Sequence, residues 1–354
     1  MNIAVIAITR GGVRIGRTLC ESGPGLQLYV SDRYADQAGH HCTLFAPHEL
    51  KTLIASLWKK HDGFVLIMAT GIVVRMIAPL LESKETDPAV VVMDDAGRFA
   101  ISLLSGHLGG ANALAERCAL TTGARAVVTT ATDANDLPSF DMLAKEQGWL
   151  IDDIRRVKTL NTLLLDNEEI AVVDRTGQAR IWLRGRGRIR FYDTFTEAAA
   201  SAAHGFLFVT DQKQPLEVAP EKLLILRPRN LVIGIGCNRG TAADEIEAVV
   251  AGHFNELCLS LKSVCTVASV AAKRDEAGLI AFAERLGVAL RCFDSCELSQ
   301  VPFPSPASEH ALAAVGVAGV AEPAAILASG GGVLLLNKVK SGNVTLAIAQ
   351  LKEA

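Results

Sequence analysis

A histidine within a glycine-rich segment is the first candidate for chemistry in this sequence. His107 lies in the segment SGHLGGAN, residues 105–112, between an apolar run and a stretch with helical spacing. Glycines let the backbone approach a ligand, and unpaired N–H groups at the start of a helix can hold an anion. An imidazole can transfer protons near neutral pH. The segment therefore indicates an anion-binding and proton-transfer site. The alternative is that the glycines serve packing alone and that His107 hydrogen-bonds a carbonyl group.

Three other segments place polar residues where a strand is predicted to end. Gly71 opens a helix that carries Arg75 about one turn later, and a guanidinium can bind a carboxylate through two hydrogen bonds. Asp95 lies in a turn after one apolar run, and Asp133 follows Thr130 after another. Ligands of α/β proteins bind at the carboxyl ends of strands. The structural alternatives are a surface salt bridge for Arg75 and a turn or helix cap for the two aspartates.

A second glycine-rich turn lies at 234–240, between a predicted strand and a predicted helix. Its amides and Arg239 could hold an anion, and Cys237 could have a lowered pKa at a helix start, although a packed thiol is the alternative. The spacing G-x-G-x-x-x-G is a weak sign of dinucleotide binding. The next strand runs into Ala-Ala-Lys-Arg without the acid that binds a ribose, which argues against NAD and less strongly against NADP. Lys273 and Glu276 can pair on ordinary helix surface.

The apolar runs that position these residues predict an α/β protein of three domains. Residues 1–135 alternate apolar runs with helical stretches, which is typical of a mostly parallel sheet. Residues 228–354 repeat the pattern and close with a hairpin around 341–343. Residues 136–227 are predicted to form a smaller α+β middle domain. Two α/β domains that flank a smaller one suggest a ligand-binding cleft between domains.

The middle segment is predicted to contain a helix at 154–165 and strands at 170–174, 179–184 and 189–192. Arginines at 184, 186, 188 and 190 alternate with small or apolar residues, so one face of a strand would be basic. We expect a solvated edge strand, whose charge prevents aggregation. Contact with an acidic ligand is the alternative.

Composition excludes several classes of function. With 38 acidic and 35 basic residues among 354, the chain has no basic excess that would attract nucleic acid. No targeting or membrane-spanning segment is evident, so a cytoplasmic protein is expected. The eight cysteines form no C-x-x-C pair, which favours free thiols over a metal site. No serine-hydrolase elbow, zinc-protease motif or P-loop is present.

Taken in order, these segments resemble the cobalt-precorrin-5A hydrolase family, also called CbiG. In the first domain the resemblance rests on residues 69–75, 87–90, 103–112 and 129–133, of which SGHLGGAN is the most specific. In the last domain it rests on residues 234–237, Gly240, Lys273, 276–279, 316–317, Lys338 and 344–347. The sequence departs from the family pattern where an extra residue separates Pro306 from Ser308.

The resemblance implies a substrate and a reaction. The substrate is cobalt-precorrin-5A, a cobalt-bound corrinoid with many carboxylate arms. Water would open its δ-lactone, and acetaldehyde would leave to give cobalt-precorrin-5B in anaerobic cobalamin (vitamin B12) biosynthesis. Cobalt would travel with the substrate, so neither a cofactor nor a protein metal site is expected. The expected partners are this small molecule and, as a homodimer or in transient contact, a second copy or other pathway enzymes, with no nucleic acid or membrane.

Roles for individual residues follow from the resemblance. His107 is the expected acid or base, with Asp95 and Asp133 as further candidate bases and the Gly109 and Gly110 amides as oxyanion donors. His107 could instead bind the cobalt axially. The residues expected to bind the substrate are Gly71, Arg75, Ser105, Gly106, Gly109, Gly110, Asn112, Thr130, Gly236, Cys237, Arg239, Gly240, Lys273, Glu276 and Lys338. Two alternatives remain, an NADP-dependent reductase of a corrin intermediate and a corrinoid-binding protein without activity.

Overall fold

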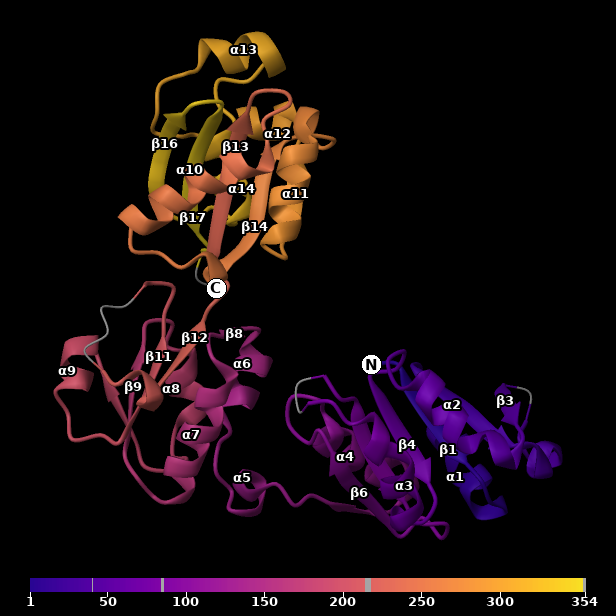
Figure 1. Cartoon of the computed structure of the whole chain (residues 1–354). Helices are drawn as coiled ribbons and strands as arrows, with labels where there is room; N and C mark the ends of the chain where they lie inside the picture. The colour runs from indigo at the N-terminus through magenta and orange to yellow at the C-terminus, as the bar shows by residue number, and fades with distance from the viewer. Residues whose placement is uncertain (40, 84–85, 214–217, 353–354) are drawn as a thin grey trace. The chain divides into compact units, whose positions relative to one another are not determined.

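The computed structural model describes residues 1–39, 41–83, 86–213 and 218–352. The chain forms two compact units, Met1–Met142 and Leu143–Ala354, here called the N-terminal and C-terminal units. One β-sheet lies in the N-terminal unit and two lie in the C-terminal unit (Figure 1). Each sheet falls within one of the three predicted domains, whereas the domain borders at 135/136 and 227/228 stay predictions.

The sheet of the N-terminal unit has seven strands in the order β3-β2-β1-β4-β5-β6-β7. The strands are β1 Ile3–Ala7, β2 Leu26–Ser31, β3 Cys42–Phe45, β4 Gly63–Ile67, β5 Ala89–Met93, β6 Phe99–Leu104 and β7 Arg125–Val127. Neighbouring strands are parallel except β5 and β6, which are antiparallel. Because β6 runs back along β5 and β7 follows the direction of β6, the carboxyl ends of β6 and β7 lie at one end of the sheet. The carboxyl ends of β1, β4 and β5 lie at the other.

Helices cover both faces of this sheet. They are α1 Arg10–Glu21, α2 Leu50–Leu57, α3 Thr70–Ile77 and α4 Ala111–Thr122. Two further helices, α5 Ala131–Ala134 and α6 Phe140–Gln147, follow β7 in the chain. Side chains alternate along β1, so Ile3 and Val5 belong to the core beneath α1 and α4, whereas Ala4 and Ile6 belong to the core beneath α2 and α3. A sheet buried on both faces explains the continuous apolar runs and confirms the predicted α/β class.

The middle sheet has five strands in the order β10-β9-β11-β12-β8. They are β8 Leu150–Ile151, β9 Ile170–Asp174, β10 Ile189–Tyr192, β11 Gly205–Val209 and β12 Leu223–Arg227, with helices α7 Ile154–Leu165, α8 Gln178–Leu183 and α9 Phe195–Ala199. Only the short β8 is antiparallel to its neighbour. The middle domain is therefore also α/β with a mostly parallel sheet, which corrects the α+β arrangement expected for it.

The prediction of a strand at 179–184 is wrong, because Gln178–Leu183 form the helix α8. Asp174, at the end of β9, accepts a hydrogen bond from the Arg180 N–H group at 2.9 Å, and Gly177 has a φ of +73°. These features turn the chain into a helix directly after the strand. Ala179 and Leu183, four residues apart, are both buried, as on one face of a helix.

The alternating arginines consequently do not share one strand. Arg184, Arg186 and Arg188 precede β10, and Arg190 lies within it. β10 is an edge strand, as expected, and Arg190 and Arg188 each lie 3.8 Å from a carboxylate oxygen of Glu169. The basic residues thus border a solvated sheet edge and do not form a continuous basic face.

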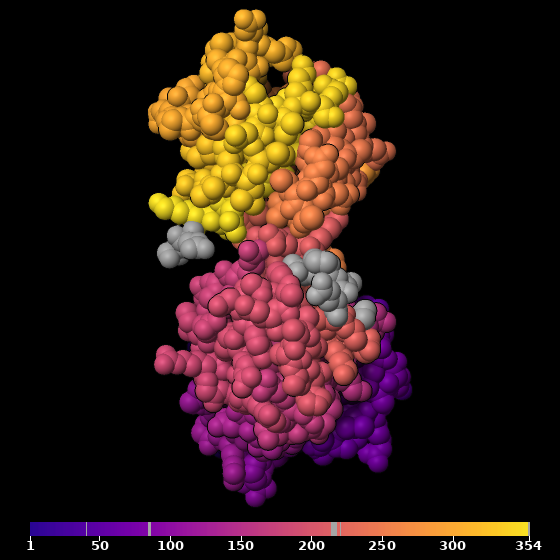
Figure 2. Space-filling view, turned by 90° about the vertical axis from the view of Figure 1, so that its left-hand side faces the viewer, coloured from indigo at the N-terminus to yellow at the C-terminus, as the bar shows by residue number. Residues whose placement is uncertain are grey.

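The C-terminal sheet has the order β15-β14-β13-β17-β16. Its strands are β13 Leu231–Cys237, β14 Val264–Val270, β15 Ala289–Phe293, β16 Leu334–Ser341 and β17 Val344–Gln350. Its helices are α10 Ala243–Glu256, α11 Ala277–Arg285, α12 Ser295–Ser299, α13 Glu309–Val315 and α14 Ala321–Ala328. β13, β14 and β15 are parallel, and β16 and β17 form the predicted hairpin. In Figure 2 the last part of the chain, in yellow, lies on the visible face of the region formed by the C-terminal sheet and its helices.

Polar contacts connect the middle and C-terminal sheets within the C-terminal unit. Asp152 accepts hydrogen bonds from Arg227 at 2.9 Å and from Lys262 at 2.6 Å. Burial opposes ionisation of Asp152, but the two cations hold its pKa below the ordinary value. These contacts join β12 to the segment just before β14. Among the described residues, no helix is long and apolar enough to cross a membrane.

Candidate functional site

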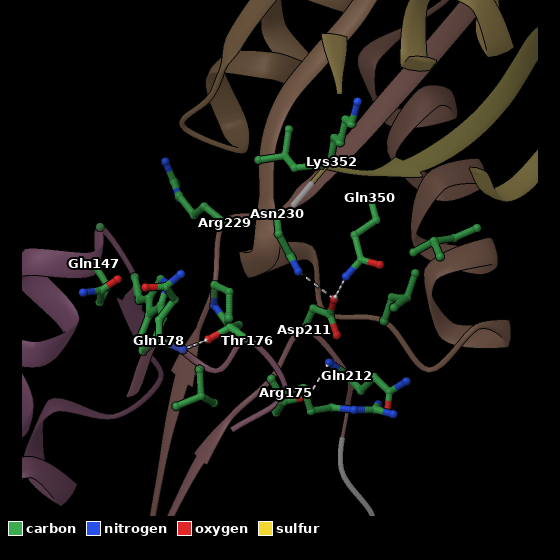
Figure 3. Close-up of a pocket in the computed structure, with 18 of the residues that line it drawn as sticks. Gln147, Arg175, Thr176, Gln178, Asp211, Gln212, Arg229, Asn230, Gln350 and Lys352 are labelled. Atoms are coloured by element: carbon green, nitrogen blue, oxygen red, sulfur yellow. Dashed lines mark hydrogen bonds between the residues drawn. The ribbon is translucent and has the colours of Figure 1, made fainter. Parts of the chain in front are cut away.

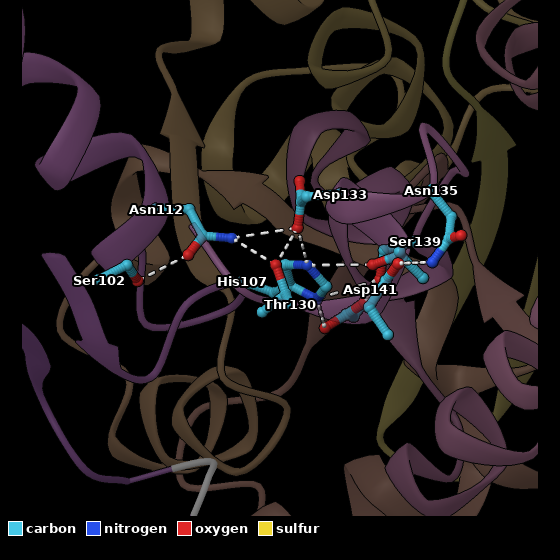
Figure 4. Close-up of polar contacts among 10 residues, drawn as sticks. Ser102, His107, Asn112, Thr130, Asp133, Asn135, Ser139 and Asp141 are labelled. Atoms are coloured by element: carbon cyan, nitrogen blue, oxygen red, sulfur yellow. Dashed lines mark hydrogen bonds and ion pairs between the residues drawn. The ribbon is translucent and has the colours of Figure 1, made fainter. Parts of the chain in front are cut away.

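His107 lies between two carboxylates at the carboxyl ends of β6 and β7 (Figure 4). Its Nε2 atom is 2.7 Å from Asp133 in α5, and its Nδ1 atom is 3.6 Å from Asp141 in α6. The Ser139 hydroxyl is 3.2 Å from Nδ1 and donates a hydrogen bond to Asp141. Only 8% of His107 is exposed. Both ring nitrogens are therefore engaged inside the protein.

These contacts favour the charged form of the imidazole. The hydrogen bond with Asp141 raises the pKa of His107 most, burial opposes it, and Asp133 raises it further. A protonated ring with two carboxylate partners has no free lone pair. The charged form could give up a proton but could not accept one or bind cobalt, and the predicted role of His107 as acid or base stays a prediction.

Asp133 is the member of this cluster that reaches solvent, with 48% of its side chain exposed. One of its oxygens, Oδ2, accepts hydrogen bonds from His107, from Thr130 and, at 3.1 Å, from Asn112. Burial would raise the pKa of Asp133, but the bonds from Thr130 and His107 lower it. Among the described side chains, no donor contacts the other oxygen, Oδ1. Asp133 thus presents one ionised oxygen to solvent while the second is fixed in place.

Asn112 is held in the orientation that this cluster needs. Its amide oxygen accepts a hydrogen bond from Ser102 at 2.7 Å, so its nitrogen must face Thr130 and Asp133. A Cβ atom at Gly106 would lie 2.6 Å from the same amide oxygen. Position 106 therefore has no room for a side chain while Asn112 keeps this place.

The SGHLGGAN segment folds back on the start of α4. The N–H groups of Ala111 and Asn112 donate to the carbonyl oxygens of Ser105 and Gly106 at 3.1 and 3.0 Å. The expectation that the first amides of this helix are open to an anion is wrong for these two. Gly109 packs against Ser105, since a Cβ atom there would lie 2.4 Å from that residue's Cβ atom. The glycines thus serve close packing that places His107.

Three predicted site residues lie at the other end of the same sheet. Asp95 follows β5, where it accepts hydrogen bonds from Thr9 and, at 3.1 Å, from the N–H group of Gly12 at the start of α1. Arg75, in α3 after β4, donates to the carbonyl oxygen of Gly71 at 3.0 Å. The structure does not bring these residues to His107, because the antiparallel turn between β5 and β6 separates the two groups.

A pocket of about 370 Å³ lies at the carboxyl ends of β13 and β14 in the C-terminal unit. Four predicted site residues line it, namely Gly236, Cys237, Lys273 and Lys338. Lys340 and His310 add further polar groups, while the wall from α13 to α14 is mainly apolar. A lysine-lined pocket with an apolar wall suits an anionic ligand with an apolar body. Its volume falls in the range of about 300–1,000 Å³ found for small-molecule sites.

Of the remaining C-terminal candidates, Glu276 is buried beside this pocket, whereas Gly240 is exposed. Glu276 accepts a hydrogen bond from the Gly240 N–H group at 2.7 Å and pairs with Lys273 at 3.0 Å. Burial would raise the pKa of Glu276, but these two partners lower it. The expectation of ordinary helix surface is wrong, because the pair is largely buried and Glu276 occupies the position where an anion would meet the amide. Arg239 is exposed.

The glycine spacing that suggested a dinucleotide has a packing origin. A Cβ atom at Gly234 would lie 2.0 Å from the Ala321 carbonyl oxygen, so this glycine allows α14 to approach β13. Cys237 lies at the end of β13 and not at a helix start. Burial raises its pKa despite the nearby Lys273, so the packed-thiol alternative fits and the lowered pKa does not.

Sequence reasoning missed the inner partners of His107. Ser139 and Asp141 are both buried at the start of α6. The pattern Ser-x-Asp after Pro138 is a recognisable helix start, and it was available as a signal. Sequence spacing alone gave no reason to connect it with a histidine more than thirty residues earlier.

Comparisons with known proteins cover almost the whole chain. Family descriptions match in order: "Cobalamin synthesis G N-terminal" at residues 52–133, "Cobalamin biosynthesis central region" at 138–228, and "Cobalamin synthesis G C-terminus" at 231–349. A cobalt-precorrin-5A hydrolase of Priestia megaterium is 38% identical over 353 residues, covering 98% of this chain and 94% of that protein. One of Salmonella typhimurium is 32% identical over 98% of each chain.

The chain was also compared with solved structures. A cobalamin biosynthesis protein G homolog from Sulfolobus solfataricus is 23% identical, with a TM-score of 0.36 over 99% of this chain and 97% of that chain. The three family descriptions and the two hydrolase relatives show that the chain belongs to the cobalamin synthesis G (CbiG) family.

Proposed function

We propose that this protein is a cobalt-precorrin-5A hydrolase, which opens the δ-lactone of its substrate with water and releases acetaldehyde to give cobalt-precorrin-5B. The observation that carries the proposal is the 38% identity to a cobalt-precorrin-5A hydrolase over 353 residues. We also propose a cytoplasmic location, and we propose that cobalt arrives with the substrate and that the protein needs no cofactor of its own.

The cluster around Asp133 supplies a chemical role for the N-terminal unit. Lactone opening adds a hydroxyl from water to the carbonyl carbon, breaks the ring C–O bond and returns a proton to the departing oxygen. Asp133 Oδ1 can take the proton of that water, and it can then give the proton to the leaving oxygen. A positioned proton-transfer group of this kind contributes about 10²–10⁴-fold to a rate.

In this proposal His107 positions the catalytic residue and does not itself act as the base. Its bond to Oδ2 fixes the carboxylate, and its positive charge keeps Asp133 ionised until a proton arrives. Asp141 keeps His107 protonated from the buried side. The role assigned to His107 from the sequence thus passes to its partner Asp133.

The pocket of the C-terminal unit supplies a role in substrate binding. A corrinoid with carboxylate arms needs cations and an apolar surface, and the pocket offers Lys273, Lys338 and Lys340 beside the apolar wall from α13 to α14. Ser308, next to the departure from the family pattern, lines the same pocket and accepts a hydrogen bond from the Ala311 N–H group at 3.3 Å. Its hydroxyl therefore has a capping role in this chain.

The test is an anaerobic incubation with cobalt-precorrin-5A, followed by mass analysis for loss of the two-carbon unit and by trapping of acetaldehyde. We expect Asp133→Asn to lower kcat by about 10²–10⁴-fold with little change in KM. Asp136→Asn is the matched control, because Asp136 is an exposed carboxylate nearby and its φ of +59° suits Asn. Equal turnover by both variants would remove Asp133 from the mechanism.

Two competing functions make different predictions. An NADP-dependent reductase needs free amides in the 234–240 turn, and the Gly240 amide is already bonded to Glu276. Titration with nicotinamide cofactors should therefore give no binding. A corrinoid-binding protein without activity would retain the substrate and release no acetaldehyde, so the same incubation separates it from an enzyme.

A further inference from the structure

A crevice in the C-terminal unit is lined by residues that the proposed mechanism does not use. Its volume is about 810 Å³, and it lies at the carboxyl ends of β9, β11 and β12 (Figure 3). Arg175 follows β9, Asp211 follows β11, and Arg229 follows β12. Gln350 and Lys352, at the end of β17, add residues from the C-terminal sheet. The middle and C-terminal sheets therefore both contribute to this crevice.

The strand order places a topological switch point between β9 and β11, next to this crevice. β9 leads through α8 to β10 on one side of it, whereas β11 leads to β12 on the other side. The loops that leave β9 and β11 therefore diverge. Ligands of α/β proteins bind outside the carboxyl ends of the strands at such a switch point. Arg175 and Asp211 lie on these two diverging loops.

The charged residues of the crevice favour an anion. Its lining includes the cations Arg175, Arg229 and Lys352 and, among charged residues, a single carboxylate, Asp211. Asp211 accepts hydrogen bonds from Asn230 at 3.0 Å and from Gln350 at 3.4 Å. The carboxylate thus has neutral partners, and the three cations are not needed to balance it.

Arg229 differs from its neighbour Arg227 in a way that points to a ligand. Arg227 is bonded to Asp152 and to the carbonyl oxygens of Thr210 and Gln212, so it holds the unit together. The Nε atom of Arg229 is buried and has no hydrogen-bond partner among the described residues. An unsatisfied buried donor costs free energy, and a turn of the Arg229 side chain toward the crevice would let a bound carboxylate accept a hydrogen bond from it.

The uncharged part of the crevice suits a flat apolar body. Trp149 lines it together with Leu257, Leu259 and Leu335. An indole ring can lie against a conjugated ring while the arginines bind groups at the rim. The volume is near the upper end of the about 300–1,000 Å³ range of small-molecule sites.

We propose that this crevice binds a carboxylate-bearing edge of the corrin macrocycle, with Arg175, Arg229 and Lys352 on the carboxylates and Trp149 on the ring face. The identity of the macrocycle as substrate rests on the proposed function. The crevice itself is a site in addition to the 370 Å³ pocket and to the cluster around Asp133.

The test measures equilibrium binding of two stable cobalt corrins to the full-length chain. One probe carries free carboxylate arms and the other carries the same arms as neutral amides. We expect Arg229→Gln and Lys352→Gln each to weaken binding of the carboxylate probe about tenfold or more, since a hydrogen bond to a charged group is being lost. Arg184→Gln, an exposed arginine of the same domain outside the crevice, should leave binding unchanged. Lys352 is exposed, so its replacement is compatible with folding.

The outcomes separate this inference from the proposed function. Unchanged binding in both crevice variants would overturn the inference, and so would equal loss with the amide probe. Inorganic phosphate that binds tightly and resists displacement by the carboxylate corrin would mean a free-anion site, which also overturns it. Absence of acetaldehyde release by the unmodified chain would count against the proposed function. The Kd of each crevice variant for the carboxylate probe, relative to that of the unmodified chain, would still decide the inference.

Discussion

Replacement of Asp141 by Asn would test whether His107 is held as a cation between two carboxylates. Asp141 is 1% exposed and His107 is 8% exposed, so the substitution leaves a buried charge with one carboxylate partner in place of two. Loss of one partner of a buried pair costs about 3–5 kcal/mol when the other charge is left uncompensated. Because Asp133 still contacts His107, we expect a cost below that range, about 2–3 kcal/mol.

The loss of folding stability in Asp141→Asn should depend on pH. The pKa of His107 is raised above its ordinary value of 6.5. A histidine with a raised folded-state pKa adds stability that is complete below the unfolded pKa and is lost as the pH rises through the folded pKa. The cost of Asp141→Asn should therefore be largest near about pH 6 and should shrink at higher pH.

Hydrogen exchange at the start of α4 is the assay that reports on this cluster. The Ala111 and Asn112 N–H groups donate to the carbonyl oxygens of Ser105 and Gly106, so they exchange only when the His107 segment opens. At about pH 6 we expect roughly 30- to 150-fold less protection in Asp141→Asn than in the unmodified chain. Asp136→Asn is the control. Equal protection in the two variants, or a loss that does not depend on pH, would refute the reasoning.

Four further predictions follow from the other contacts. Asp133, whose pKa is lowered, adds stability that is present above its ordinary pKa of 3.8 and is lost as the pH falls through the folded-state value, so Asp133→Asn should flatten the acid limb of a pH–stability curve. Glu276→Gln removes the acceptor charge at Gly240 and should lower Tm by about 2–4 °C in thermal unfolding, whereas Glu284→Gln, on exposed α11 surface, should not. Gly234→Ala should abolish soluble expression, because its Cβ atom would lie 2.0 Å from a backbone oxygen of Ala321, and normal yield would contradict this packing. Thiol titration of the native chain should leave Cys118 unreacted, since burial raises its pKa to about 12, while exposed Cys258 and Cys296 react.

The sequence was sufficient to predict the elements that carry strong periodicity. The predicted alternation of strands and helices in residues 1–135 is confirmed by β1, β4, β5 and α4, because burial of both sheet faces leaves a clear apolar pattern. The basic edge of the middle sheet was also predicted, whereas α8 was mistaken for a strand. The buried pair Ala179 and Leu183 was a helical signal, but six residues are too few for periodicity to decide.

The grouping of the candidate residues could not be predicted in the same way. Asp95 and Asp133 both follow strands, yet they lie at opposite ends of one sheet because β6 reverses direction after the turn at 94–98. The Asp-x-Gly sequence of that turn was a hairpin signal between two apolar runs. Gly106 is in the predicted binding set and Gly234 is part of the weak dinucleotide spacing, but an asparagine and a backbone carbonyl group fill the space beside them. Spacing alone does not distinguish a glycine that admits a ligand from one that admits a neighbouring side chain.

Isotope labelling would show whether water opens a lactone beside Asp133. The chain is incubated anaerobically with cobalt-precorrin-5A in water enriched in the heavy oxygen isotope, and the mass of the tetrapyrrole product is measured by mass spectrometry. We expect a heavy oxygen atom to enter the carboxylate of the opened lactone, at a rate that falls strongly in Asp133→Asn and is unchanged in Asp136→Asn. A tetrapyrrole product that has lost acetaldehyde but carries only ordinary oxygen would contradict hydrolysis.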